Sequence, residues 1–593
     1  MALWPVIPHC QCERGPGHNF RASASGLGHR KNPALKNILQ EGTQERHSRM
    51  GACAKLAIAF IASIVVTFVS VIALVISEQT GPYRLVGSRV ERAISAYQQG
   101  PDVQAAAPAR RAGSNKCLSR LEERIHEILA RSPVPTWGVL VYNSKHGGEL
   151  YSRSADRSFV PASGMKLLTA AAALNRLAEN FNFTTRIYRS PNSRNAVCLV
   201  PVGDPTFSDS HLNSLVRKTL EALKLPEGSP IEIRVVGVGG SEEPPEVWEA
   251  GDISQPYGAH AGLAVINDNL INVRVSPGQP GQPLVASLFG RDIGAVKLDT
   301  GDSMTGADGY GPTLLRVMYA VDADSRLVLK TSGTLSANSP PVWFLRAARP
   351  AGRLLTLHLQ GALSENGFGP NRASVVALHR HDQTGRCAFE ANESAVLASS
   401  SSRTLVPLLA RVLEYSDNLY TESLMMALGN GDRRVGLQTV EDAVRDVLET
   451  SDAQKVPGAL FSMHGLVMMD AAGLSRQNLV SPRLFVSLLE GMRKSSLLRH
   501  CLPVSGRSGT LAWRMRGTAA EGIVFAKTGT ITGVSSLSGY LAHLTLGLTT
   551  FSIVANNVPG RVKGGSLRSV QDAILVALAE ARAADLERHT SCE

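Results

Sequence analysis

Several sequence signatures are missing from this chain of 593 residues. It has no HExxH and no CxxC, so neither motif indicates a metal or redox site. The run from Gly237 to Gly240 lacks the remainder of a dinucleotide- or phosphate-binding loop, and a glycine cluster between strand and turn is the simpler interpretation. Gly-X-Y repeats and long heptad arrays are also absent, which excludes fibrous folds.

The composition is that of a folded protein. Charged residues make up only 19% and hydrophobic residues 44%, so the chain can build a sizeable core and is not mainly disordered. Residues 1–55 carry eight Lys/Arg against three acidic residues, a net +5 out of +11 for the whole chain. This concentration of basic charge before an apolar run argues against a nucleic-acid partner.

The apolar run at residues 56–76 is 21 residues long and has no charge, which is enough to span a bilayer as a helix. Basic residues precede it, so the rest of the chain is expected outside the cytoplasm, in a bacterial cell envelope. We expect an uncleaved membrane anchor within residues 50–77; a cleaved signal peptide and a buried core helix are the alternatives. Residues 1–49 have no hydrophobic period, and Met50 is a second candidate start.

Eight cysteines are spread widely along the chain, and five of them follow the apolar run: Cys117, Cys198, Cys387, Cys501 and Cys592. An oxidising compartment permits disulfides, but an odd number at wide spacing names no pair.

After a linker at 78–117, two segments that predict both helices and strands flank a mostly-β stretch. Residues 118–188 predict a helix at 118–130, a β-hairpin at 137–151 and a helix after Pro161. Residues 189–389 predict a mostly-β insert, from five short β-like runs: IEIRVVGVG, INVRVSPG, RLVLKTSG, RLLTLHLQG and ASVVALHRH.

Residues 390–585 return to helices and finish with a late antiparallel sheet. Strands are expected at 523–528, 534–542 and 546–555, followed by a terminal helix at 567–587, and 586–593 form a tail. Helices around such a sheet predict an α+β domain composed of 118–188 and 390–585.

Ser163 and Lys166 form an S-x-x-K pattern at a predicted helix start. Positions three apart share one helix face, so the hydroxyl and the amine can meet. Serine becomes a nucleophile when a base removes its proton, and lysine can be that base if its pKa falls. Alone the pattern is weak, because a solvated helix lysine explains it equally well.

Two further clusters are also weak when taken singly. Ser416-Asp417-Asn418 places polar groups between two predicted helices, where turn chemistry is the simpler interpretation. Lys527-Thr528-Gly529-Thr530 ends a predicted strand, where a lysine can simply deter edge pairing.

The order S-x-x-K, S-D-N, K-T-G is the strong signal, since this trio is typical of penicillin-binding proteins and serine β-lactamases. From about 118 to 585 the sequence resembles the class C penicillin-binding proteins of the D-alanyl-D-alanine carboxypeptidase/endopeptidase type. Beyond the trio the resemblance rests on five further motifs: Gly203-Asp204-Pro205-Thr206, Tyr257-Gly-Ala259 with Asn267-Asp-Asn269, Asp470-x-x-Gly473-Leu-Ser-Arg476-x-Asn478, Ser481-Pro482, and Leu502-Pro-Val-Ser-Gly506-x-x-Gly509-Thr-Leu. The 250 residues between Lys166 and Ser416 leave room for the insert of this family, which simple β-lactamases lack.

The resemblance implies a penicillin-recognising, transpeptidase-like fold and an acyl-enzyme mechanism on peptidoglycan stem peptides, inhibited by β-lactams. Ser163 would attack the penultimate D-Ala carbonyl, and Lys166, kept neutral by its surroundings and by the nearby cation Lys527, would accept the proton. Ser416 would pass a proton to the leaving amine, and Asn418 would hold Lys166 and the substrate amide.

The resemblance also implies binding residues. Lys527 and Thr528 would bind the terminal carboxylate, and the backbone N–H groups of Ser163 and Thr530 would form the oxyanion hole. Gly529 and Asp417 complete the predicted binding set, with Asp204 and Arg476 as candidates for a subsite that binds the stem-peptide side chain. No metal or organic cofactor is expected.

Two other functions remain open. A class A β-lactamase would carry E-x-x-L-N some 35 residues after S-D-N, and Glu449-Thr-Ser-Asp-Ala does not match it. A catalytically idle penicillin-binding wall protein would not need all six polar groups of the trio.

Overall fold

The computed structural model describes most of the chain after residue 118: residues 119–132, 136–146, 148–238, 244–289, 296–307, 315–321, 327–379, 387, 393–558 and 564–587. The predicted anchor at 56–76 and residues 1–49 lie outside these ranges. Within them, no helix combines the length and the hydropathy that a membrane span requires.

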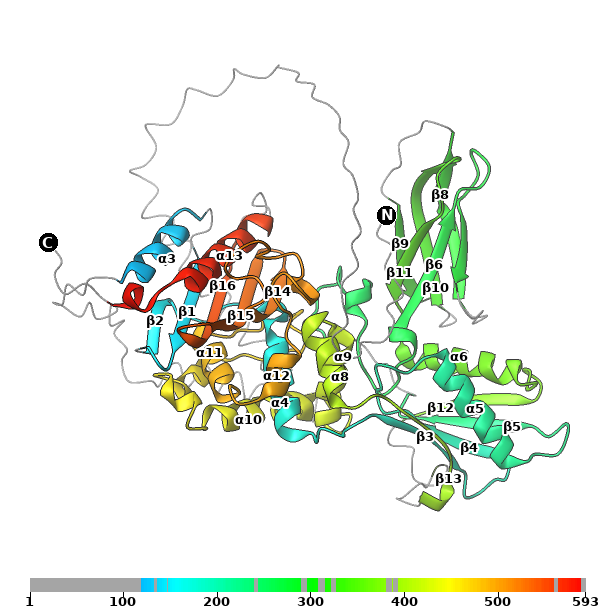
Figure 1. The fold of residues 1–593 in the computed structure, drawn as a ribbon. Coiled ribbons are helices and arrows are strands. Elements are labelled where there is room, and N and C mark those ends of the chain that lie inside the picture. Colours follow the sequence, from blue (N-terminus) through cyan, green and yellow to red (C-terminus); the bar gives the residue numbers. More distant parts are fainter. Residues whose placement is uncertain are drawn as a thin grey trace, which may run out of the picture. The chain divides into compact units, whose positions relative to one another are not determined.

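A five-stranded antiparallel sheet joins the two ends of the described chain (Figure 1). Its order is β14-β15-β16-β1-β2, so the first hairpin pairs with the last strands. The strands are β1 (Trp137–Asn143), β2 (Gly148–Arg153), β14 (Val524–Ile531), β15 (Val534–His543) and β16 (Gly547–Ala555).

Helices cover both faces of this sheet, and β1 shows why. Val139 and Val141 pack with α3 (Arg120–Ala130) and α13 (Gly564–Glu580). Leu140 and Tyr142 point to the opposite face, where Val486 of α11 contacts them. Successive side chains of a strand alternate between faces, so a strand buried on both sides is apolar throughout.

A helical layer lies against the α11 face and carries most of the predicted site. Its core unites six helices: α4 (Lys166–Arg176), α8 (Leu405–Glu414), α9 (Asn418–Leu428), α10 (Arg433–Leu448), α11 (Pro482–Gly491) and α12 (Ser496–His500). Short 3₁₀ turns connect elements across the chain: η1 (Ala162–Met165), η2 (Pro256–Gly258), η3 (Asn267–Asn269), η5 (Glu393–Ala395), η6 (Ala453–Lys455), η7 (Leu460–Gly465), η8 (Gly509–Leu511) and η9 (Ala583–Leu586).

The predicted insert contains a second five-stranded sheet, of order β12-β5-β4-β3-β13. Its elements are β3 (Thr184–Arg189), β4 (Ala196–Val200), α5 (Asp209–Leu223), β5 (Ile231–Val236), α6 (Ala351–Glu365), β12 (Ala373–Leu378) and β13 (Val396–Ser401). β4, β5 and β12 run parallel, while β3 and β13 are antiparallel to their neighbours. This sheet therefore begins at Thr184 and ends at Ser401, slightly outside the predicted limits 189 and 389.

Two three-stranded sheets lie within the same stretch. One has the order β11-β6-β7 and the other β8-β10-β9. Their strands are β6 (Leu270–Ser276), β7 (Val285–Phe289), β8 (Val296–Gly306), β9 (Arg316–Val321), β10 (Leu327–Ser336) and β11 (Val342–Ala347).

The prediction of a strand for RLLTLHLQG was wrong, because these residues lie in α6. Four of the five β-like runs contain strands, but this one is a helix capped by Pro350 and buried through Leu354, Leu355 and Leu359. Alternating leucines look like a strand, yet leucine is also a strong helix former.

A disulfide joins Cys198 on β4 to Cys387, with 6.0 Å between their Cα atoms. It closes a loop of 189 residues within the inserted stretch. Cys501 is buried and forms no disulfide with a described residue. The sequence left this pairing open.

Candidate active site

The first cluster joins Ser163 to Lys166. Ser163 lies in the 3₁₀ turn η1, and Lys166 is the first residue of α4. Residues three apart eclipse one another in a 3₁₀ turn, so their side chains lie close together. The Lys166 Nζ donates to Ser163 Oγ over 3.1 Å.

Lys166 is fully buried and has two further acceptors, which come from distant parts of the chain. Its amine donates to Asn418 Oδ1 at 2.6 Å and to the Ala472 carbonyl at 2.5 Å. Burial lowers the pKa of Lys166 to about 8, although the negative charge of Asp470 opposes this shift. Near pH 8 the amine can therefore lose a proton and become a base for Ser163.

The second cluster joins Ser416 to Lys527. Lys527 on β14 is fully buried, and its Nζ donates to Ser416 Oγ at 2.9 Å and to the Thr528 carbonyl at 2.7 Å. Burial first, and then the charge of Lys166, lower the pKa of Lys527 well below its usual value. The charge of one lysine thus lowers the pKa of the other at Lys527, whereas Lys527 is not among the causes of the shift at Lys166; burial is the main cause for both amines.

The loop between α8 and α9 holds Ser416 in an unusual backbone conformation, with φ of 61°. Asp417 follows as the N-cap of α9: its carboxylate accepts from the Tyr420 N–H at 3.3 Å and pairs with Arg411 at 2.9 Å. These contacts orient the helix start, and the substrate-binding role of Asp417 stays a prediction.

Asn418 uses both ends of its amide. Oδ1 accepts from Lys166, and Nδ2 donates to the Tyr257 carbonyl at 2.7 Å. Tyr257 belongs to the inserted stretch, so this side chain connects the insert to the Lys166 amine. The predicted hold on Lys166 is present in the structure, and the amide nitrogen already has an acceptor.

Two glycines allow the segments around Ser163 to approach closely. A Cβ at Gly529 would lie 2.4 Å from the Pro161 carbonyl and 2.9 Å from the Gly164 nitrogen. A Cβ at Gly473, where φ is +85°, would lie 1.9 Å from the Ala162 carbonyl. Both positions need glycine because backbone packs directly against the turn that carries Ser163.

A buried glutamate supports the Ala472 carbonyl, and the sequence analysis did not single it out. Glu422 Oε1 accepts from the N–H groups of Ala471 and Ala472 at 3.0 and 2.8 Å, and Oε2 pairs with Arg433 at 2.7 Å. Burial raises the pKa of Glu422. One signal was available: Glu422 lies four residues after Asn418 and therefore on the same face of α9.

Asp470 supports the same loop from its other side. Its fully buried carboxylate accepts from Gly473 N at 2.5 Å, Ser475 N at 2.6 Å and Asn478 Nδ2 at 2.9 Å. Trp248 of the inserted stretch donates its indole N–H to Asp470 at 2.8 Å. The loop that presents the Ala472 carbonyl is thus tied to the insert.

Asp204 and Arg476, the two weaker candidates for substrate binding, contact residues outside the two serine–lysine pairs. Asp204 is buried and accepts from the N–H and hydroxyl of Thr206 at 2.8 and 2.7 Å, and burial raises its pKa. Arg476 pairs with Glu249 and donates to the Thr532 carbonyl at 2.7 Å. Their assignment to a side-chain subsite stays a prediction.

A cavity of about 330 Å³ opens over the two serines. Its hydroxyl-bearing lining comprises Ser163, Ser416, Thr510, Thr528 and Thr530. The Thr528 hydroxyl donates to that of Thr510 at 2.9 Å. A polar ligand in this cavity would contact the predicted nucleophile directly.

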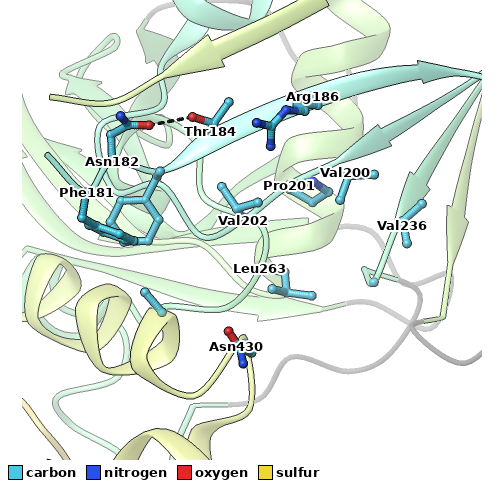
Figure 2. A pocket seen from close by; sticks show the side chains of 14 residues that line it. Phe181, Asn182, Thr184, Arg186, Val200, Pro201, Val202, Val236, Leu263 and Asn430 are labelled. Atoms are coloured by element: carbon cyan, nitrogen blue, oxygen red, sulfur yellow. Dashed lines mark hydrogen bonds between the residues drawn. The ribbon is translucent and has the colours of Figure 1, made fainter. Parts of the chain in front are cut away.

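A second cavity, of about 580 Å³, lies elsewhere and is lined by both apolar and polar groups (Figure 2). The figure shows Phe181, Val202 and Leu263 around it, with Asn182 accepting a hydrogen bond from Thr184. None of the residues predicted to be catalytic lines it.

The described ranges contain no group of three or more His, Cys, Asp or Glu side chains arranged to hold a metal ion.

Known proteins resemble this chain over most of its length. A D-alanyl-D-alanine carboxypeptidase of Actinomadura sp. (strain R39) is 34% identical over 504 residues, covering 80% of this chain and 87% of that protein. The crystal structure of penicillin binding protein 4 (dacB) from Haemophilus influenzae covers 77% of this chain and 99% of its own, with a TM-score of 0.64 and 21% identity. The same protein complexed with a β-lactam matches with a TM-score of 0.60 and 19% identity.

The structural likeness confirms the predicted fold of a penicillin-binding protein for the described residues. A family model covers residues 121–581, and together with the Actinomadura relative it confirms the resemblance seen in the sequence and the assignment as a serine-type peptidase. The chain belongs to the D-Ala-D-Ala carboxypeptidase 3 (S13) family.

Proposed function

We propose that this protein is a serine D-alanyl-D-alanine carboxypeptidase and D,D-endopeptidase that acts on peptidoglycan stem peptides through an acyl-enzyme on Ser163. One observation carries the proposal: a buried amine, Lys166, donates to the Ser163 hydroxyl at 3.1 Å, while a second, Lys527, donates to Ser416 at 2.9 Å. Two serine–lysine pairs at one cavity provide a route for a proton to the base and back to a leaving group.

Acylation begins with neutral Lys166. The amine takes the Ser163 proton as Oγ bonds to the carbonyl carbon of the penultimate D-Ala. The carbonyl oxygen gains negative charge, and the backbone N–H groups of Ser163 and Thr530 stabilise it. The C–N bond then breaks, and the proton that Lys166 took from Ser163 passes through Ser416, which is hydrogen-bonded to Lys527, to the leaving amine, so that Lys166 is neutral again.

Deacylation uses the same amine and serine groups, with water as the nucleophile and Ser163 as the leaving group. Water loses a proton to the amine–serine system and attacks the ester carbonyl, and the Ser163 oxygen leaves with that proton. The products are the shortened peptide and free Ser163. A β-lactam follows the acylation step but stays attached as a penicilloyl ester.

The substrate and the location follow from the same site. A carboxypeptidase releases terminal D-Ala, and a D,D-endopeptidase breaks the equivalent bond in a cross-link. Both substrates lie in the bacterial cell envelope. We place the protein there through the anchor predicted at residues 56–76, with residues 118–188 and 390–585 as the catalytic domain and 189–389 as its insert.

Labelling with fluorescent penicillin followed by peptide mapping tests the proposal. The wild-type protein should carry a stable adduct on Ser163, release D-alanine from a pentapeptide and split a cross-linked muropeptide. Ser163→Ala should do none of these, while Ser210→Ala, at an exposed serine of α5, should behave as wild type.

Wild-type inactivity on both peptides would overturn the proposal and favour an idle wall protein. Rapid turnover of penicillin, in place of a stable adduct, would favour a β-lactamase.

A further inference from the structure

Residues 248–257, a segment of the inserted stretch, contact both groups that hold the Lys166 amine beside Ser163. The first contact is made by the Tyr257 carbonyl, which accepts from Asn418 Nδ2 at 2.7 Å, while Asn418 Oδ1 accepts from Lys166 at 2.6 Å. Turning this amide over would place its N–H groups against the Lys166 amine and its oxygen against the Tyr257 carbonyl. The contact with the segment therefore fixes the amide orientation that Lys166 needs.

The second contact is made by Trp248, at the other end of the segment. Its side chain is buried, and its indole N–H donates to Asp470 Oδ2 at 2.8 Å. The same oxygen accepts from the Ser475 N–H at 2.6 Å, so Trp248 shares it with the backbone of the loop. That loop also presents the Ala472 carbonyl, which accepts from Lys166 at 2.5 Å. Trp248 thus contacts the loop on which the other acceptor of Lys166 lies.

Backbone hydrogen bonds fold the segment into consecutive turns and tie it to a strand of the insert. Gln255 N donates to the Asp252 carbonyl at 2.9 Å, and Gly258 N donates to the Gln255 carbonyl at 2.9 Å. A Cβ at Gly258 would lie 2.0 Å from the Asp252 carbonyl, so this turn requires glycine. The Ala347 N–H of β11 donates to the Ser254 carbonyl at 3.2 Å. Both contacts with the site therefore start from a backbone that its own turns and β11 hold in place.

We propose that the 248–257 segment positions the catalytic base, so that the insert takes part in acylation. Trp248 is the positioning side chain, and it acts on Lys166 through Asp470. The inference rests on the proposed function. It gives the insert a role in the reaction and leaves the set of catalytic residues unchanged.

Electrostatics gives this role a readout that a purely structural contact lacks. The charged groups around Lys166 are Asp470, Asp417 with its partner Arg411, Glu422 with its partner Arg433, and Lys527. Burial lowers the pKa of Lys166 to about 8, and the charge of Asp470 is the largest of the influences that oppose this shift. The Trp248 N–H compensates part of the Asp470 charge. Its loss should therefore raise the pKa of Lys166 and leave less neutral amine at pH 7.

Trp248→Phe tests the inference, because it removes the N–H donor and keeps an aromatic ring. Three donors to Asp470 remain: Gly473 N, Ser475 N and Asn478 Nδ2. The rate of acylation by penicillin at pH 7 should therefore fall about 3- to 10-fold, less than the full effect of losing a hydrogen bond to a charged group. The pH profile of acylation, measured by stopped flow, should shift to higher pH.

Trp137→Phe is the matched control. Trp137 is buried on β1, and its indole N–H donates to Ser132 at 3.0 Å, so the variant also loses one buried ring and one hydrogen bond. It should keep the wild-type acylation rate and pH profile. A thermal melt of both variants compares their losses of stability.

A second variant separates the donor from the packing of the ring. Incorporation of β-(3-benzothienyl)alanine at position 248 keeps the shape of the indole and replaces its N–H by sulfur, and it should shift the profile as Trp248→Phe does. If neither variant shifted the profile, or if Trp137→Phe shifted it equally, the positioning role would be overturned. If the wild type formed no penicillin adduct at any pH, the proposed function itself would fail.

Discussion

Two cavities among the described residues differ in size and in the groups that lie around them. The larger, about 580 Å³, has a lining of apolar and polar side chains without a serine (Figure 2). The smaller, about 330 Å³, is lined by hydroxyls and two arginines, and two buried amines donate to its serines. The difference shows that reactivity follows from convergent ionisable groups, whereas a large volume alone supplies none.

Burial explains how a lysine beside the smaller cavity can act as a base. A lysine amine in water is protonated at neutral pH, while burial lowers the pKa of Lys166 to about 8. The hydrogen bonds of Asn418 and Ala472 hold that amine beside Ser163. Arg186, the one cation that lines the larger cavity within the described ranges, has no such hydrogen bonds and no serine beside it in the cavity lining.

The largest effect is expected from removing the base. Lys166→Met keeps most of the side-chain volume and should slow acylation by penicillin about 10²- to 10⁴-fold, the usual contribution of general-base catalysis. Stopped-flow or mass-spectrometric acylation rates measure the loss, and a thermal melt verifies folding. Lys218→Met, at an exposed lysine of α5, is the matched control.

Wild-type acylation rates in Lys166→Met would show that another group accepts the serine proton. Lys527 would then be the next candidate.

Acylation should also depend on pH in a defined direction. The active form of Lys166 is the neutral amine, which dominates above its pKa of about 8. The rate should therefore fall about tenfold per pH unit below 8 and level off above it. A pH profile of acylation measures this, and a rate that rises toward acid would contradict the role of Lys166 as a base.

Much of this site could be predicted from the sequence. Ser163, Lys166, Ser416, Asn418 and Lys527 lie in motifs with fixed spacing. The first four occur at the predicted helix start and inter-helix loop, whereas Lys527 lies in the middle of β14 and not at its end, because that strand continues to Ile531. The spacing of residues along the sequence predicts such positions, because the period of a helix or strand determines which side chains lie on the same face.

The supporting contacts could not be predicted in this way. Glu422 reaches Ala471 and Ala472 across 49 and 50 residues, and Trp248 reaches Asp470 across 222. The pairing of Cys198 with Cys387 spans 189 residues. No local period encodes these contacts, because they depend on how segments that are far apart in the chain pack together.

A smaller effect is expected from the carboxylate that supports the Ala472 carbonyl. Glu422→Ala should lower kcat/KM about tenfold, since two buried N–H groups lose their acceptor and the carbonyl that holds Lys166 loosens. Glu422→Gln keeps an acceptor oxygen and should retain most of the activity.

The pH profile separates this role from a purely structural one. The negative charge of Glu422 raises the pKa of Lys166, so its removal should shift the acylation profile to lower pH. An unshifted profile in Glu422→Gln would argue against electrostatic contact between the two groups.

The smallest effect is expected in the larger cavity. Arg186→Ala should change acylation and peptide hydrolysis by less than about twofold, because its guanidinium has no hydrogen bond or ion pair among the described residues and lines a cavity without a predicted nucleophile. Compared under the same assay, Arg568→Ala removes the same group from the other cavity. Equal losses in the two variants would mean that the enzyme responds to total charge; a loss confined to Arg568 would show that the position of the guanidinium beside Thr510 and Thr528 determines its effect.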